Sequence, residues 1–293
     1  MIRNILVAMA DSHGGNNQGL LNPETVLERD DESGQQHKYN PQLTPFQELV
    51  FDSYLGHIEK VKQLAGRDKI VFMHVGDLTQ GNRYEENWVS SRLSDQILIA
   101  YYNLTPWMEL KNIELIRLAK GTGVHVFKEG SSEIIVAKLL QNEFPDKNIS
   151  CVYHGLLTLN NFTIDYAHHG PFPGSRDWLK GNVATYYLRD IMKHDLKANK
   201  RPPDLVLRAH FHEYIRCQNI EWWGENNDEY ISTLVTLPSY CGGGDNGIRA
   251  SRSRDTLQIG LCAFEIVDGK LLDVHRFFET YDIRTKETIN DLG

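Results

Sequence analysis

The chain has 293 residues, of which 41% are hydrophobic and 24% are charged. This composition is typical of a globular protein with a sizeable core, and it excludes a disordered or fibrous chain. The 31 Lys and Arg against 39 Asp and Glu give a net charge of −8. That balance argues against a protein that binds DNA tightly through a globally basic surface, so any polyanionic substrate must be bound locally.

The cysteines and the early residues indicate the compartment. The four cysteines are Cys151, Cys217, Cys241 and Cys262. Their wide spacing, without a Cys-x-x-Cys pair, fits reduced thiols better than a disulfide or zinc framework. The longest early apolar run, residues 5–10, is far shorter than the roughly 18 residues that cross a bilayer. We therefore expect a cytoplasmic protein that does not contact a membrane.

The first residues predict a strand that leads into a polar loop. The apolar run over residues 2–9 has the character of a buried strand, and it stops just before Asp11 and His13. Residues 14–43 are rich in Asn, Gly, Asp and Gln with little periodicity. We expect a long surface loop there, because segments of this length without periodicity are commonly loops with a function of their own.

A helix is predicted to follow this loop. Thr44 suits its cap, Pro45 suits its first position, and Gln47 completes a capping box. Gly66 suits its end. Strands are then expected over 69–75 and 113–119, and helices over about 85–103 and 131–141. This recurrence of strand, polar tip and helix favours parallel βαβ units.

The second half of the chain predicts further strands and one helix. The expected strands cover residues 162–167, 205–209, 231–237, 258–267 and 271–278, and the helix covers about 183–196. Asp268 and Gly269 form a two-residue hairpin turn between the last two strands. No linker or internal repeat interrupts the chain, so we expect a single α/β domain over residues 1–293.

Five of the predicted strands end in Asp or His side chains. These residues are Asp11, His13, Asp77, His125, His168, His169, His210 and His212. Ligands in open α/β sheets bind beyond the carboxyl ends of the strands, so these tips are expected to converge on one crevice. Imidazole together with carboxylate suits Zn, Mn or Fe. Two such ions would bind a phosphate and activate a water, so the pattern predicts hydrolysis of a phosphate ester.

The order of these motifs resembles that of the calcineurin-like metallophosphoesterase superfamily. The motifs are Asp11-Ser12-His13, Gly76-Asp77, the segment 121–125, His168-His169-Gly170 and Ala209-His210-Phe211-His212, all within residues 1–215. The long segment after the first motif most resembles the enzymes that phages and prophages encode, which would place the protein in a host cytoplasm. The resemblance implies two facing mixed β-sheets flanked by helices, with residues 216–293 completing the second sheet.

The resemblance also implies two divalent transition-metal ions, of Mn, Zn or Fe. The residues that would hold the first ion are Asp11, His13, Asp77 and His212. Asp77 would bridge to a second ion, which His210 and one of the pair His168 and His169 would also hold. Family members that read His-His-Pro-Pro favour His168 and members that read His-Gly-Gly favour His169, so both remain candidates.

The third motif departs from the family pattern of Gly-Asn-His. Thr122 stands where the metal-binding Asn is expected, and His125 comes two residues late. A hydroxyl is a poorer ligand than an amide oxygen. Either Thr122 binds the second ion weakly, or a water takes that place, or the second ion binds only with substrate. His125 and the bridging Asp77 are the expected catalytic residues, with His125 donating a proton or stabilising the phosphoryl charge.

Three arginines are candidate contacts for the substrate phosphate. Arg83 and Arg176 follow two of the motif tips, and Arg252 lies in the basic run 249–254. That run fits a solvated loop equally well. His74 lies inside an apolar strand, so it is expected to be buried and to have no role in the site.

The resemblance predicts a metal-dependent phosphoesterase, with a phosphodiesterase on nucleic acid or a nucleotide as the first hypothesis. A phosphomonoesterase or phosphoprotein phosphatase is the alternative, because the same metal centre serves all three. A non-catalytic binding module that keeps the metal-stabilised fold is a further alternative, because the third motif is altered. The complete set of first-site ligands favours an enzyme.

Overall fold

The computed structural model describes residues 2–83, 88–126, 131–172, 179–243 and 255–288. The helices in these ranges are α1 (Pro45–Ala65), α2 (Leu93–Met108), α3 (Ser131–Glu143) and α4 (Asn182–Lys197). The strands are β1 (Arg3–Met9), β2 (Leu27–Asp30), β3 (Gln36–Tyr39), β4 (Lys69–His74), β5 (Ile113–Ala119), β6 (Asn148–Val152), β7 (His154–Leu159), β8 (Phe162–Ala167), β9 (Leu205–Arg208), β10 (Ile215–Trp223), β11 (Asp228–Thr236), β12 (Thr256–Val267) and β13 (Lys270–Asp282).

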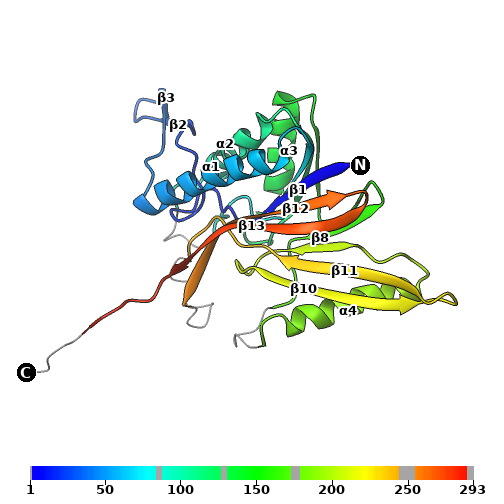
Figure 1. Ribbon diagram of the computed structural model, residues 1–293. Coiled ribbons are helices and arrows are strands. Elements are labelled where there is room, and N and C mark those ends of the chain that lie inside the picture. Colours follow the sequence, from blue (N-terminus) through cyan, green and yellow to red (C-terminus); the bar gives the residue numbers. More distant parts are fainter. Residues whose placement is uncertain (1, 84–87, 127–130, 173–178, 244–254, 289–293) are drawn as a thin grey trace, which may run out of the picture.

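The strands form two large mixed sheets that face each other (Figure 1). The first has the order β13-β12-β1-β4-β5-β6, in which β1, β4, β5 and β6 are parallel and joined by α1, α2 and α3. The second has the order β10-β11-β9-β8-β7, and α4 connects the parallel strands β8 and β9. The predicted βαβ units are therefore confirmed, and the carboxyl ends of five strands lie on one side of the molecule.

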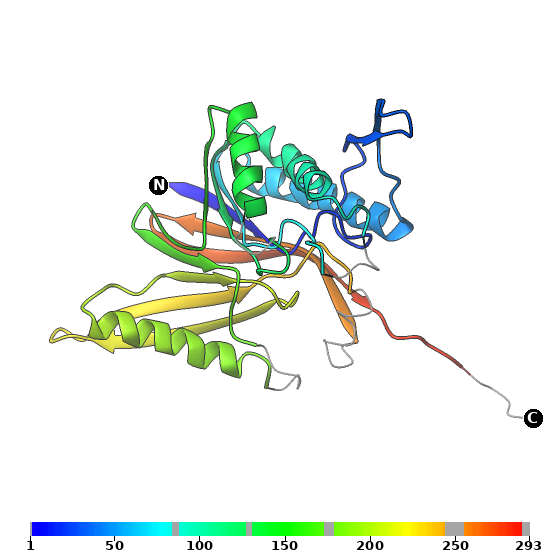
Figure 2. The same cartoon turned by 180° about the vertical axis from the view of Figure 1, so that it is seen from behind.

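Helices cover the outer face of each sheet (Figures 1 and 2). Successive residues of β1 alternate between two cores, because side chains alternate across a strand. Ile5 and Val7 pack under α1 and α2, while Leu6 and Ala8 pack between the sheets. On the other side, Leu188 of α4 belongs to a smaller core with β9 and β11. The predicted architecture of two mixed sheets flanked by helices is thus confirmed.

Two local predictions, the capping box of α1 and the hairpin turn at residues 268–269, are confirmed. Thr44 caps α1 through a hydrogen bond from the backbone of Gln47, whose side chain accepts one from the backbone of Thr44. Asp268 and Gly269 have φ values of 47° and 75°, as a type I′ turn between β12 and β13 requires.

In the described ranges, no helix combines the length and the apolarity that crossing a membrane requires.

The segment 14–43 corrects the expectation of a surface loop. Residues 14–16 and 19–22 are buried, and β2 pairs with β3 in a separate hairpin. The buried part is stable because amide side chains satisfy its backbone: Asn103 of α2 accepts a hydrogen bond from the backbone of Asn22, and Gln47 donates to the carbonyl of Asn16. A segment rich in Asn and Gln can therefore be internal when its amides bond to the main chain.

Two further expectations need correction. Residues 216–293 do not all complete the second sheet, because β12 pairs with β1 and carries β13 into the first sheet, while β10 and β11 join the second. The helix expected over about 85–103 begins at Leu93 and extends to Met108 with Pro106 inside it. Strands β6, β7 and β10 were not expected, and each occupies or neighbours a sheet edge.

Candidate metal centre

The tips of β1, β4, β5, β8 and β9 meet at one end of the facing sheets. Backbone hydrogen bonds hold neighbouring tips in register: Asp11 donates to the carbonyl of Gly76 at 3.0 Å, and Ala209 donates to that of His168 at 2.9 Å. The backbone of His210 donates to Asp11 Oδ2 at 3.2 Å, which ties a tip of the second sheet to a tip of the first. The expected convergence is therefore present.

The backbone is strained at the same tips. The residues with φ between 44° and 77° there are Asp11, His13, Asp77, His210 and His212. The left-handed region costs a residue other than glycine about 1–2 kcal/mol. Gly76 also has a positive φ, and a Cβ there would overlap the ring of His168. Strain concentrated at five neighbouring candidates is typical of a functional site.

The first group of candidate ligands joins Asp11, His13 and His212. The Nε2 atom of His212 lies 3.2 Å from Asp11 Oδ1 and 3.3 Å from Nε2 of His13. Asp11 is fully buried and His13 is 4% exposed. Two imidazoles and a carboxylate gathered in this way are a donor set for a borderline transition metal.

Asp77 lies between this group and the others. It forms one group with His13 and His125 and another with Asp11 and His168. Its Oδ2 is 3.0 Å from His168 Nε2. Its Oδ1 accepts a hydrogen bond from the backbone of Thr122 at 2.6 Å. A Cβ at Gly121 would overlap this carboxylate, so the close approach of the third motif requires glycine.

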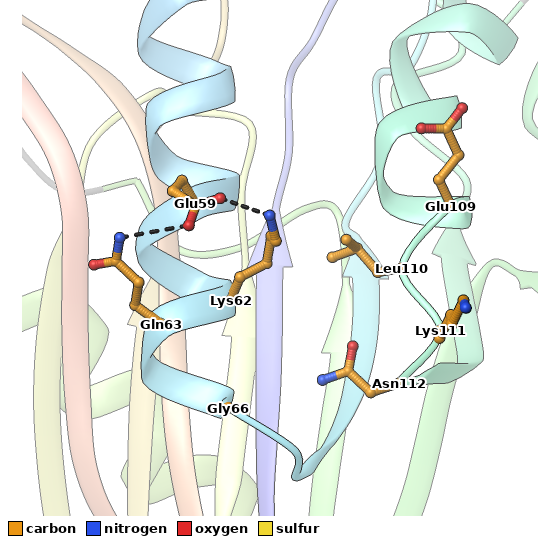
Figure 3. Close-up of a pocket in the computed structure, with 8 residues that line it drawn as sticks. All are labelled: Glu59, Lys62, Gln63, Gly66, Glu109, Leu110, Lys111 and Asn112. Carbon is orange, nitrogen blue, oxygen red and sulfur yellow. Dashed lines mark hydrogen bonds and ion pairs between the residues drawn. The ribbon is translucent and has the colours of Figure 1, made fainter.

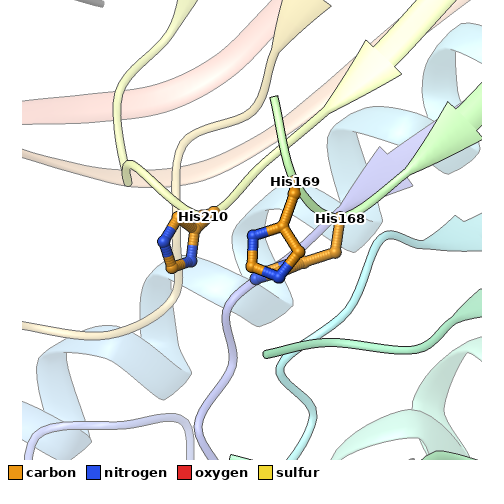
Figure 4. Close-up of side chains that lie close together, drawn as sticks. All are labelled: His168, His169 and His210. Carbon is orange, nitrogen blue, oxygen red and sulfur yellow. The ribbon is translucent and has the colours of Figure 1, made fainter. Parts of the chain in front are cut away.

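The last group consists of His168, His169 and His210 (Figure 4). His168 is 1% exposed, and its Nδ1 bonds to the carbonyl of Val75 at 2.7 Å, so Nε2 faces the carboxylates. His169 is exposed, and its ring centroid lies 4.7 Å from that of His210. Both members of the adjacent pair therefore lie in the cluster, but His168 alone contacts Asp77.

Unsatisfied buried atoms test whether these residues fit metal ions. Among the described residues, the buried atoms Asp11 Oδ1 and His168 Nε2 make no hydrogen bond of good geometry, and each has a polar neighbour in the cluster instead: His212 Nε2 at 3.2 Å and Asp77 Oδ2 at 3.0 Å. Native proteins rarely bury such atoms without a good hydrogen bond, so these short approaches leave binding capacity that a metal ion could use. Both atoms point into the cluster and both are metal-binding atom types. The residues therefore fit divalent transition-metal ions.

The charges of the cluster are coupled. Burial raises the pKa of Asp11, but His212 and His168 outweigh it and hold that pKa well below the usual range. The pKa of Asp77 is likewise low, because His168 outweighs the effect of burial. Burial lowers the pKa of His168, yet Asp77 and Asp11 raise it to about 9. Two buried carboxylates are thus ionised at neutral pH and attract cations.

His125 lies at the edge of the cluster. Its ring is perpendicular to that of His13, with 4.6 Å between centroids, and its Nδ1 bonds to the carbonyl of Gln80 at 2.6 Å. Burial, together with His13, lowers its pKa to about 4. With Nδ1 engaged in this way, Nε2 donates a proton only from the charged form, which a bound phosphate would favour.

Thr122 and the arginines are placed as follows. The Thr122 hydroxyl lies 3.1 Å from His210 Nδ1 and 3.3 Å from Asp77 Oδ2, between two candidate ligands. Arg83 is exposed, two residues after Gly81, which packs against Val124 and His125. Its contact with a phosphate stays a prediction. Arg176 and Arg252 lie outside the described residues.

Some supporting groups were missed in the sequence. His74 is buried as expected, but its Nε2 lies 3.0 Å from the hydroxyl of Ser12, between Asp11 and His13 in the chain. The carbonyls of Val75 and Gln80 orient His168 and His125. Backbone groups carry no side-chain signal, so only their position in the polar segment that follows β4 could have suggested them.

A surface pocket elsewhere contains none of these residues. It has a volume of about 480 Å³ and lies between the end of α1 and the segment after α2 (Figure 3). Its lining includes the ion pair of Glu59 and Lys62, with 2.6 Å between Oε2 and Nζ. No histidine or cysteine belongs to its described lining, so it offers no comparable donor set.

Comparisons with known proteins give weak likenesses. No protein-family model matches the chain, and no curated protein matches it. Among solved structures, the sulfate thiohydrolase SoxB of Thermus thermophilus, in complex with glycerol, is 11% identical with a TM-score of 0.36. That match covers 95% of this chain but 56% of SoxB, so the chain spans little more than half of that protein.

A second solved structure is a metallophosphoesterase from Sphaerobacter thermophilus. It is 10% identical, with a TM-score of 0.32, and the match covers 96% of this chain and 89% of that one. Likenesses with TM-scores this low carry no argument about the site. The function is therefore inferred from the residues and their geometry.

Proposed function

We propose that the protein is a metal-dependent phosphoesterase of the calcineurin-like metallophosphoesterase type, with two divalent transition-metal ions. The observation that carries this proposal is the position of Asp77 between groups of Asp and His donors. A carboxylate shared by two donor groups suits a pair of ions that act on one phosphate. The motif order in the sequence supports the same conclusion independently.

The chain offers a distinct role for each residue. Asp11, His13, Asp77 and His212 would hold the first ion. Asp77, His210 and one of the pair His168 and His169 would hold the second. When bound, the two ions would activate a water for in-line attack and offset the phosphoryl charge. His125 would donate a proton to the leaving oxygen from Nε2, since the Gln80 carbonyl holds Nδ1. Arg83 would contact the phosphate from the exposed side.

For the substrate, we propose a phosphodiester of nucleic acid or a nucleotide. This part rests on the resemblance to phage and prophage enzymes. The net charge of −8 is compatible with a small nucleotide or a local groove, and less so with avid binding of a duplex. A phosphomonoesterase or phosphoprotein phosphatase is the alternative activity, because the same donor set serves it.

The test combines metal analysis with hydrolysis. The purified protein is analysed for metal content and, after manganese is added, assayed on bis-p-nitrophenyl phosphate and on p-nitrophenyl phosphate. We expect about two ions per chain and hydrolysis of the diester. In Asp77→Ala, both ions and at least about 99% of the activity should be lost, because a single transition-state contact already contributes about 100-fold.

Each other outcome has a definite meaning. Hydrolysis of the monoester alone would replace the diesterase by the phosphomonoesterase. Full metal occupancy without turnover of either ester would overturn the enzyme and favour a metal-stabilised binding module. Unchanged hydrolysis in Asp77→Ala would show that the cluster is not the active site.

A further inference from the structure

We propose that His169 is a ligand of the second metal ion together with His168 and His210, and that it takes the place of the amide ligand that the third motif lacks. The inference rests on the proposed metal centre and defines its second half. It makes the second site richer in imidazole than the first. The two alternatives His168 and His169 then become two ligands of one ion.

The geometry of the three rings allows them to bind one metal ion together. Ring centroids are 5.1 Å apart for His168 and His169, 4.7 Å for His169 and His210, and 5.2 Å for His168 and His210. One nitrogen of each ring lies within 4.8 Å of the others. The rings come from the ends of the parallel strands β8 and β9 and gather at one point (Figure 4).

The other two histidines have supports that His169 lacks. The carbonyl of Val75 fixes the ring of His168, and the hydroxyl of Thr122 contacts Nδ1 of His210. In the described part of the chain, the ring of His169 makes no hydrogen bond, and its contacts are the two neighbouring rings. Imidazole rings packed edge to face gain little from one another, whereas a metal ion between them would bind a ring nitrogen of all three.

The backbone next to His169 limits where its ring can go. A Cβ at Gly170 would lie 2.7 Å from Cβ of the buried Arg208, so this turn is packed tightly against β9. The turn therefore presents His169 beside His210. Because His169 is also exposed, its ring lies on the side of the cluster that solvent reaches.

The donor sets of the two sites then differ in kind. The first has two imidazoles and two carboxylates, while the second has three imidazoles and the shared Asp77. Imidazole suits Zn, Fe, Ni and Cu, whereas carboxylate and carbonyl oxygens suit Mg, Ca and Mn. The second site should therefore select zinc over magnesium and manganese more strongly than the first.

The test is a calorimetric titration of the metal-free 293-residue chain with Zn²⁺. Wild type is expected to bind two ions. His169→Ala is expected to keep the affinity of one ion and to weaken the other at least ~10-fold, since even indirect supports of a metal ligand contribute ~10–100-fold. His37→Ala is the matched control, because His37 is exposed and bonded to Asp31, away from the cluster. It should bind as wild type does.

Two further readings decide the interpretation. In the zinc-loaded protein, X-ray absorption should show less imidazole scattering per ion in His169→Ala than in wild type, which a purely structural effect would not produce. Unchanged affinities in His169→Ala, or an equal loss at both sites, would overturn the inference. Because neither reading depends on turnover, a protein that binds zinc as expected yet hydrolyses no ester would refute the proposed function and leave the ligand set intact.

Discussion

The two sheets support their tip residues with different chemistry. The first sheet carries the carboxylates Asp11 and Asp77, and the groups behind them are uncharged hydrogen-bonding groups or a carboxyl with a raised pKa. The uncharged group is His74, because burial lowers its pKa to about 3. The carboxyl is that of Glu133, because burial raises its pKa to about 7. The second sheet carries histidines, and an ion pair lies behind them: Arg208, which is 1% exposed, lies 2.6 Å from Asp165.

This difference indicates how the cluster keeps its charge. A fixed cation behind Asp11 or Asp77 would neutralise the carboxylates and compete with metal ions for them. Uncharged supports leave that negative charge available. The histidines of the second sheet bring no carboxylate, so a paired cation can be buried under their strand without weakening the site. Behind the carboxylates of the first sheet only uncharged groups preserve the charge of the cluster, whereas behind the histidines of the second sheet a paired cation is compatible with it.

Removing the buried guanidinium of Arg208 in the second sheet should have the largest effect on the free energy of unfolding. Arg208→Met is expected to lower the free energy of unfolding by about 3 kcal/mol, because it leaves the largely buried Asp165 with only the exposed ring of His154, whose Nε2 lies 2.9 Å from Oδ2. Arg208 also bonds to the hydroxyl of Tyr187, which is lost as well. Urea unfolding measures the change.

The matched control is Arg189→Met, because Arg189 is exposed whereas Arg208 is buried, although its partner Glu221, 3.3 Å away, is as buried as Asp165; a loss below about 1 kcal/mol is expected. Adding Asp165→Asn to Arg208→Met should recover part of the stability, because the uncompensated charge is then gone. Equal losses for Arg208→Met and Arg189→Met would contradict an energetically important buried pair.

The support behind Asp77 should make stability depend on pH. Glu133 is fully buried and has a hydrogen bond from Ser132 at 2.8 Å. Burial raises its pKa from 4.5 to about 7, so between these values the folded chain binds a proton that the unfolded chain has lost. Stability therefore falls as pH rises through this window, by about 3 kcal/mol in total.

Glu133→Gln removes this titration. In metal-free protein, the variant should match wild type at pH 5 and exceed its free energy of unfolding by about 3 kcal/mol at pH 8. Glu143→Gln on the same helix is the control, since Glu143 is exposed. A difference between Glu133→Gln and wild type that is the same at both pH values would show that Glu133 is charged throughout.

Much of the fold follows from local patterns. The apolar runs before Asp11, Asp77 and His168 predicted strands, and the capping box predicted where α1 begins. The pairing of β12 with β1 could not be predicted, because it joins residues more than 250 positions apart and leaves no local trace. The buried part of 14–43 was missed for a related reason: its polar composition is typical of surface loops, and the amides that satisfy its backbone include Asn103, from a distant helix.

The candidate ligands were predictable because side-chain type and strand ends are both visible in the sequence. Their relation to one another was not. That His168 contacts Asp77, while His169 contacts His210, depends on the left-handed turns after the strands and on the distance between the sheets. The supports were harder still, because His74 and Glu133 look in the sequence like ordinary members of a strand and a helix.

The smallest effect is expected at the uncharged support of the first sheet. Ser12 and His74 are fully buried, and their hydroxyl and Nε2 are 3.0 Å apart, while Nδ1 of His74 has no partner among the described residues. Ser12→Ala leaves the ring without this hydrogen bond, which should lower the free energy of unfolding by about 2 kcal/mol. Ser232→Ala is the matched control, because Ser232 is equally buried but its hydroxyl has no described partner, so its loss should be close to zero. In a double-mutant cycle with His74→Phe, the two losses should not add, since each removes the same contact. Additive losses would show that the hydroxyl and the imidazole do not stabilise each other.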